Sequence, residues 1–250
     1  MAQPSNVARL AAQPFELILS SGFFGFFAHA GVVRALEELG LRPALVGGSS
    51  AGALVSGMWA AGLSAEAIRD RLFSLKREDF WDPDPLFFLR GGILRGERFA
   101  ALLDDALAST GVNVMEDCKT PVRLVVFDVA ARRAVALSSG SLASAIRASC
   151  TVPGMFQPTR IDGRAYLDGG ITDRAGILAA TPGAPVLYHH LPAKSPWRRF
   201  TPMLNRPPDR VGLTMLCEPA LPRLSPWHLD RGPHAYALAR EMTLRSLDKV

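Results

Sequence analysis

A Gly-x-Ser-x-Gly pentapeptide lies where an expected strand turns directly into an expected helix. This is Gly48-Ser49-Ser50-Ala51-Gly52. Residues 44–47 before it have the short apolar character of a buried strand, and residues 50–61 carry small and apolar side chains at helical spacing. A nucleophile elbow needs such small neighbours, because its tight turn lifts a serine hydroxyl from the edge of a sheet. The pentapeptide therefore indicates a layered α/β fold with Ser50 as candidate nucleophile, or else a small-residue turn that only packs a strand on a helix.

The alternation of strand and helix begins before this junction and continues after it. Residues 15–20 are typical of a strand and residues 26–39 of a helix, and Ser64 is placed to cap a helix that runs to Phe73. Such an opening predicts an α/β fold with a mostly parallel central sheet flanked by helices. We expect further strands at 122–128, 134–138, 165–167, 186–189 and 211–216, and further helices at 142–149 and 234–247.

Length and composition fit one domain over residues 1–250. A chain with 48% hydrophobic and 20% charged residues is of ordinary globular type, which excludes a disordered or collagen-like chain. We expect a loose N-terminal tail at 1–13. Eleven of the 19 prolines lie within 182–233, so we expect this part to form loops that wrap over the domain with short strands between them.

Charge and cysteine content limit the partners and the compartment. The formal net charge of +5 is a mild excess that does not indicate a nucleic-acid partner. Three cysteines stand far apart and cannot all pair within the chain, which favours reduced thiols and a cytoplasmic location. No metal site is expected, since only His189 and His190 lie near one another among possible ligands.

A stretch without charged side chains runs from Leu17 to Val33 and reaches the lower limit of a membrane-spanning length. Serine, glycine and histidine interrupt it, and Glu16 stands where the apolar part of a signal peptide would begin. We therefore expect a strand, a turn and a helix here, and neither a signal peptide nor a transmembrane helix.

A serine hydroxyl needs a base to take its proton. A Ser-His-Asp triad in hydrolase order would combine Ser50, an aspartate such as Asp168, and a late histidine, for which His189 and His190 are the best candidates. In doubly wound hydrolases, however, several strands precede the elbow. Here only one strand precedes the strand that leads to Ser50, which argues against a triad.

Two other segments suggest a different arrangement. The turn Ser20-Ser21-Gly22-Phe23-Phe24-Gly25 precedes a helix and is suited to present backbone amides to an oxyanion. Much later, Tyr166-Leu167-Asp168-Gly169-Gly170 ends a strand with a carboxylate on a two-glycine turn.

Together with the early elbow, these segments resemble the patatin-like phospholipases over residues 15–173, and residues 145–158 are similar to the family's segment before its aspartate. The resemblance implies a three-layer patatin-like fold and a Ser-Asp dyad that uses neither histidine, cofactor nor metal. It assigns Ser50 as nucleophile and Asp168 as base. The other implied site residues are Gly48 and Gly52 in the elbow, Gly169 and Gly170 in the Asp-Gly-Gly motif, and Gly22 and Phe23 in the oxyanion hole.

One segment departs from the family, which usually has Gly-Gly-Gly-x-Arg/Lys-Gly in its oxyanion loop. Here the loop reads Ser21-Gly22-Phe23-Phe24-Gly25-Phe26, without a cation. Backbone donors do not depend on the side chain, so the amides remain available. His29, in the following helix, is expected to pack or to order this loop.

The resemblance thus implies a serine lipid acyl hydrolase of the phospholipase A or esterase type, acting through an acyl-enzyme on a lipid or ester substrate. Because an ordinary aspartate is a weak base at pH 7, the dyad needs Asp168 to be desolvated, with a raised pKa. The alternatives are a carboxylesterase or thioesterase with a histidine triad, and a non-catalytic member of the fold that binds acyl chains or a protein.

Two further segments are candidates for substrate contact. Residues 80–94 combine aromatic, aliphatic, proline and glycine residues, as in a lid or an acyl-binding wall. Residues 197–206 mix arginines with apolar side chains, which suits peripheral contact with an anionic bilayer. Ordinary loop packing is the alternative for both.

Overall fold

The expected alternation of strand and helix is present in the computed structural model, which describes residues 6–192 and 208–248. The helices are α1 (Asn6–Ala11), α2 (Phe26–Glu38), α3 (Ala51–Ala60), α4 (Ala65–Phe73), α5 (Phe87–Arg90), α6 (Glu97–Ala108), α7 (Leu142–Ser149) and α8 (Gly232–Asp248). The strands are β1 (Glu16–Leu19), β2 (Leu45–Ser49), β3 (Gly92–Leu94), β4 (Val122–Asp128), β5 (Arg133–Leu137), β6 (Gly154–Phe156), β7 (Thr159–Ile161), β8 (Arg164–Asp168), β9 (Val186–His190) and β10 (Leu213–Cys217). Short 3-10 helices are η1 (Arg77–Phe80), η2 (Met115–Asp117), η3 (Gly169–Ile171), η4 (Ile177–Ala179) and η7 (Leu229–Arg231).

The described residues form an eight-stranded sheet in the order β10-β9-β1-β2-β4-β8-β7, with β5 also paired to β4. Neighbours from β10 to β4 are parallel, whereas β5, β8 and β7 join antiparallel. Only residues 129–132 separate β4 from β5, too few for the crossover of about a dozen residues that a parallel pair requires. The α/β fold with a sheet flanked by helices is confirmed, and the sheet is mixed.

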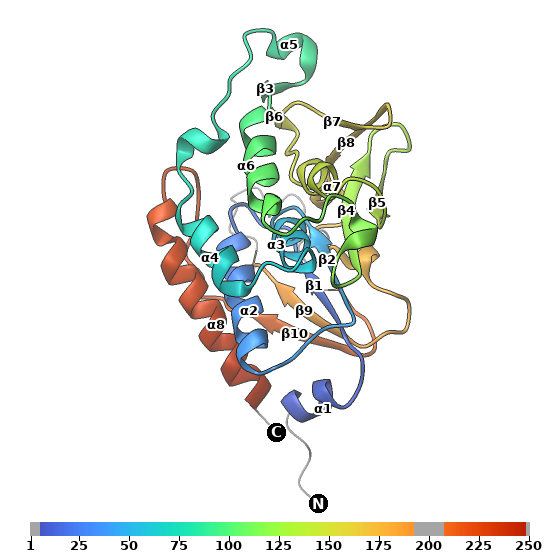
Figure 1. The fold of residues 1–250 in the computed structure, drawn as a ribbon, viewed down its shortest axis with the longest axis vertical. Helices are drawn as coiled ribbons and strands as arrows, with labels where there is room; N and C mark the ends of the chain where they lie inside the picture. Colours follow the sequence, from blue (N-terminus) through green and yellow to red (C-terminus); the bar gives the residue numbers. More distant parts are fainter. Residues whose placement is uncertain (1–5, 193–207, 249–250) are drawn as a thin grey trace, which may run out of the picture.

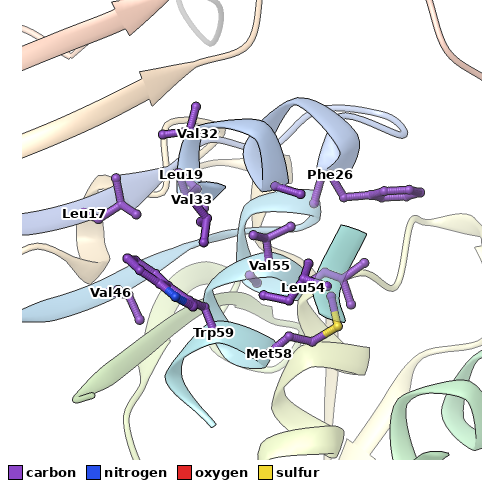
Figure 2. Packing of buried hydrophobic residues seen from close by; sticks show 14 of the residues in the cluster. Leu17, Leu19, Phe26, Val32, Val33, Val46, Leu54, Val55, Met58 and Trp59 are labelled. Atoms are coloured by element: carbon purple, nitrogen blue, oxygen red, sulfur yellow. The ribbon is translucent and has the colours of Figure 1, made fainter. Parts of the chain in front are cut away.

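Side chains of β1 alternate between two cores. Leu17 and Leu19 face the larger core beneath α2 and α3, whereas Ile18 packs in a smaller cluster with Tyr188 on the opposite face. Successive side chains of a strand point to opposite faces, so a strand that is covered on both sides carries apolar side chains toward both, as Leu17, Ile18 and Leu19 do. Figure 2 shows the larger core, where Leu17, Leu19 and Val46 lie beside side chains of both helices.

Helix α8 runs along α2 on the outside of the molecule (Figure 1). Gly31 makes this close packing possible, because a Cβ there would lie 2.2 Å from the carbonyl oxygen of Tyr236. The guanidinium of Arg240 joins the two helices by an ion pair with Glu38 at 2.6 Å.

Some expectations about the ends and the middle of the chain were incomplete. The loose tail expected at 1–13 is wrong for residues 6–11, which form α1. Leu10 is buried there, and the side chain of Asn6 donates to the carbonyl of Ser246 at 3.1 Å. Helix α6 and the small sheet of β3 and β6 were not predicted. Residues 197–206, where anionic lipid contact was predicted, lie outside the described residues.

The uncharged stretch from Leu17 to Val33 forms β1, a turn and the first part of α2, as expected. Within 6–192 and 208–248, none of the helices has the length and apolar character needed to cross a bilayer.

Candidate active site

Ser50 lies at the sharp junction of β2 and α3, in a backbone conformation that side chains seldom adopt. Its φ of 53° and ψ of −118° are those of a strained turn, which costs on the order of 1–3 kcal/mol. The flanking glycines allow the turn to approach β1 closely. A Cβ on Gly48 would lie 2.2 Å from the carbonyl oxygen of Leu19, and one on Gly52 would lie 2.0 Å from the same atom. The junction therefore has the geometry of a nucleophile elbow.

The peptide of Ser50 is held from the end of α7. The amide of Ser50 donates to the hydroxyl of Ser149 at 2.8 Å, and that buried hydroxyl donates in turn to the carbonyl of Val125 at 2.6 Å. The thiol of Cys150 donates to the Ser50 carbonyl at 3.3 Å. These contacts were not predicted, although both residues lie in or beside the segment that resembles the family's motif.

Sheet register brings Asp168 beside the elbow. Ser49 is opposite Val125 between β2 and β4, and Val126 is opposite Asp168 between β4 and β8. At the end of β8 the Asp168 carboxyl is hydrogen-bonded by the hydroxyl of Ser50 and accepts from the amide of Gly170 at 2.7 Å. Residues 118 positions apart in the sequence are thus joined.

Burial is the main influence on the Asp168 carboxyl, which is 6% exposed. Desolvation raises its pKa to about 6, against the opposing effect of the hydrogen bonds from Ser50 and Gly170. A carboxylate with this pKa is largely ionised at neutral pH yet more basic than an ordinary aspartate. The raised pKa that a serine–aspartate pair requires is therefore present.

The two glycines after Asp168 have steric roles. A Cβ on Gly169 would lie 2.3 Å from the carbonyl oxygen of Val125, and one on Gly170 would lie 2.5 Å from the hydroxyl of Ser21. Close approach at these two positions places the carboxylate turn against both the central sheet and the loop after β1.

Hydrogen bonds to the neighbouring backbone fix the orientation of the loop after β1. The amide of Ser21 donates to the carbonyl of Arg174 at 2.8 Å, and that of Gly25 donates to the carbonyl of Gly22 at 2.8 Å. Between them, the amides of Gly22 and Phe23 donate to no acceptor within the described part of the chain. Both residues also line the same cavity as Ser50, so they remain candidates for an oxyanion hole.

Leu191 and Arg174 support this loop, and no pattern in the sequence points to either residue. A Cβ on Gly22 or Gly25 would lie 2.5 Å or 2.1 Å from the side chain of Leu191. The guanidinium of Arg174 donates to the Leu191 carbonyl at 3.1 Å. The two glycines are therefore needed for the close fit of the loop, beyond any flexibility that they give it.

A buried pair of histidines orders the start of the loop. His29 Nε2 lies 2.8 Å from the carbonyl oxygen of Ser20, and its Nδ1 lies 2.8 Å from Nδ1 of His189. Because a carbonyl only accepts, Nε2 of His29 carries the proton, and Nδ1 of His29 accepts from His189. Burial lowers the pKa of His29 to about 4 and holds that of His189 well below its usual range. The loop-ordering role expected for His29 agrees with these contacts.

The histidines suggested for a triad have their ring contacts elsewhere. His189 pairs with His29, and Nδ1 of His190 lies 3.1 Å from the hydroxyl of Tyr188. Within the described residues, no hydrogen bond joins the hydroxyl of Ser50 to a histidine. The contact of Ser50 with a carboxylate favours a dyad over a triad.

An apolar cavity of about 350 Å³ opens at Ser50. Phe23 and Phe24 line it from the loop after β1, and Phe26 lines it from the first turn of α2, whereas Phe27 packs in the core without lining the cavity. The expected acyl wall at residues 80–94 contributes four further lining residues, Phe80, Trp81, Ile93 and Leu94. The cavity therefore offers an apolar surface next to a nucleophilic hydroxyl.

No group of His, Cys, Asp and Glu able to hold a metal ion occurs within residues 6–192 and 208–248. Within the same residues no disulfide joins Cys118, Cys150 or Cys217, and burial raises the pKa of each thiol.

Comparison with known proteins identifies similar sequences. A family model described as patatin-like phospholipase matches residues 17–181. An uncharacterised NTE family protein of Mycobacterium tuberculosis (strain ATCC 25618 / H37Rv) is 37% identical over 157 residues, which are 63% of this chain and 42% of that protein. The lysophospholipase NTE1 of Mycosarcoma maydis is 30% identical over 174 residues, which are 68% of this chain and 9% of that protein.

Among solved structures, VipD from Legionella pneumophila has a similar fold, with a TM-score of 0.56 at 16% sequence identity. The match covers 94% of this chain and 67% of that one. In sequence, the chain spans less than half the length of the mycobacterial relatives that it matches.

Proposed function

Because the chain belongs to the patatin-like phospholipase family, we propose that it is a serine lipid acyl hydrolase that cleaves a carboxylic ester through Ser50 and Asp168. The observation that carries the proposal is the hydrogen bond between the strained elbow serine and a buried carboxyl whose pKa is raised to about 6. This contact pairs a nucleophile with a base at the wall of an apolar cavity.

The first half of the reaction forms an acyl-enzyme. Asp168 takes the proton of the Ser50 hydroxyl while the oxygen attacks the ester carbonyl carbon. The amides of Gly22 and Phe23 stabilise the negative oxygen of the tetrahedral intermediate, and the N-terminus of α3 adds a favourable dipole. The intermediate then expels the alcohol, which leaves with the proton from Asp168.

The second half returns the enzyme to its starting state. Asp168 takes a proton from water, and the resulting hydroxide attacks the acyl carbonyl. The carboxylic acid is released as Ser50 regains its proton from Asp168. Each proton that the carboxylate takes is passed on, so the cycle needs no further reactant.

A lipid is the substrate class that the cavity fits best. Its described lining is almost wholly aliphatic and aromatic, which suits an acyl chain beside the ester. One relative is called a lysophospholipase, which agrees with this choice.

Ester turnover by purified variants tests the proposal. Ser50→Ala and Asp168→Asn should each lose turnover of a fatty acyl ester while remaining folded by circular dichroism. Ser49→Ala is the matched control. The hydroxyl of Ser49 is buried without a hydrogen-bond partner in the described residues, so its loss should leave turnover within about twofold. Retained turnover in folded Ser50→Ala would overturn the proposed nucleophile, and retained turnover in Asp168→Asn would overturn the base.

A further inference from the structure

One cationic side chain lies in the wall of the otherwise apolar cavity. Arg77, the first residue of η1, is the only charged residue among the described residues that line it. The guanidinium carbon lies 5.0 Å from the ring centroid of Trp81 and 5.4 Å from that of Trp227. Trp81 follows η1 and Trp227 precedes η7, so two distant segments of the chain position the same cation.

Arg77 has no acidic partner. Every Asp and Glu of the chain lies within residues 6–192 and 208–248, and none of them forms an ion pair or hydrogen bond with Arg77. By contrast, Arg71 in the preceding helix pairs with Asp105 at 2.7 Å. The fold thus places an exposed, unneutralised guanidinium at the rim of the cavity.

Stacking on aromatic rings holds a guanidinium without using its N–H groups. The five donors of Arg77 therefore remain available in their plane, an arrangement that matches the oxygens of a phosphate. The loop after β1, which has no Arg or Lys between Ser20 and Phe27, offers no cation for this purpose. A lipid ester with a phosphate head group would meet the apolar walls, Ser50 and Arg77 in one cavity.

Resting on the proposed hydrolase function, we propose that Arg77 binds the phosphate of the substrate's head group. The cavity then selects phosphate-bearing lipid esters over uncharged esters with the same acyl chain. Arg77 is in this sense a specificity-determining residue, separate from the atoms that break the ester bond.

Binding to Ser50→Ala protein tests this separately from turnover. The two ligands are 1-acyl lysophosphatidic acid and the 1-monoacylglycerol with the same chain, each below its critical micelle concentration. They differ only by the phosphate. Fluorescence provides the readout, since Trp81 and Trp227 flank the cation. The phosphate-bearing lipid should bind about tenfold or more tightly, as expected for a charge-assisted hydrogen-bonded contact.

Arg77→Gln in the same background should abolish this preference, while the affinity for monoacylglycerol changes less than about twofold. Arg77→Lys should keep part of the preference, because lysine has the same charge as arginine but lacks the planar set of donors of the guanidinium. The matched control is Arg133→Gln, which removes an exposed arginine of β5 that does not line the cavity and should keep the full preference.

Three results would overturn the assignment: an undiminished preference in Arg77→Gln, an equal loss of affinity for both lipids, or Arg77-dependent binding of inorganic phosphate as tight as that of the phospholipid. Turnover by protein with Ser50 intact separates the two proposals. If it hydrolyses neither lipid although the binding preference depends on Arg77, the hydrolase function fails and the head-group site stands.

Discussion

At the scale of single residues, Asp168 links burial to chemistry. The need for a more basic aspartate could be argued from the sequence, because a serine–aspartate pair without histidine requires it. The cause of the raised pKa could not be argued from the sequence, because it is the burial that β8, the central sheet and the elbow create together. Desolvation of this one carboxyl raises its pKa to about 6.

This pKa predicts the pH dependence of activity. Asp168 must be ionised to take the proton of Ser50, so kcat/KM should rise with pH through an apparent pKa of about 6 and level off above it. The measurement is a pH–rate profile with an uncharged ester, whose own ionisation cannot contribute. Full activity persisting well below this pKa would show that an ordinary carboxylate, or another base, acts.

At the scale of secondary structure, the sequence was informative wherever local patterns decide the outcome. Helix α7 spans the expected residues, and Ser64 caps α4 by accepting from the amide of Ala67 at 3.1 Å. Helix α6, with its apolar positions, was missed, and so was the antiparallel side of the sheet. Strand pairing depends on contacts between distant segments, which one sequence does not display.

The support of the elbow by α7 predicts an effect of Ser149→Ala. The change leaves the partly buried amide of Ser50 without its acceptor, which costs about 1 kcal/mol or more. The peptide that carries the nucleophile is then less firmly held, so kcat should fall about tenfold. Ser56→Ala is the control, because Ser56 is also buried and donates to the carbonyl of Gly47 at 3.0 Å, away from the nucleophile. Equal turnover by the two variants would contradict the role given to Ser149.

The elbow's close contact with β1 predicts a loss in Gly52→Ala. A methyl group 2.0 Å from the Leu19 carbonyl must push β1 and α3 apart, so both stability and turnover should fall, the former by about 2 kcal/mol or more. Gly183→Ala is the control, because φ is +80° there and the added Cβ would have no packing neighbour within 4 Å. It should cost only about 1 kcal/mol, from backbone strain. Chemical denaturation measures the free energy of unfolding of both variants, and an equal decrease in the two would refute the steric argument.

At the scale of the whole molecule, the cavity is assembled from segments spread along the chain. The sequence identified residues 80–94 as a candidate acyl-binding wall, and four of them line the cavity beside the phenylalanines that follow β1. It gave no indication that Trp227 joins them, because that requires the path of the chain after β10. Apart from Arg77, the exposed side chains at the rim are apolar, among them Phe23, Ile93 and Trp227, which are 52%, 49% and 66% exposed.

An apolar rim around the cavity predicts binding to a lipid surface. Ile93→Ser/Trp227→Ser should reduce the vesicle-bound fraction several-fold in flotation assays, since burying each side chain contributes about 1.5–3 kcal/mol. The control is Leu178→Ser/Val211→Ser, which changes exposed apolar residues outside the cavity and should bind as the unaltered protein does. The prediction fails if both double variants bind equally.

The proposed mechanism depends above all on Ser50 as an activated nucleophile. Its most direct test is reaction with a fluorophosphonate, followed by mass spectrometry of the intact protein and its peptides. We expect a single adduct on Ser50, which is lost in Ser50→Ala and retained in Ser49→Ala. An unlabelled folded protein, or an adduct on another residue that persists in Ser50→Ala, would contradict it.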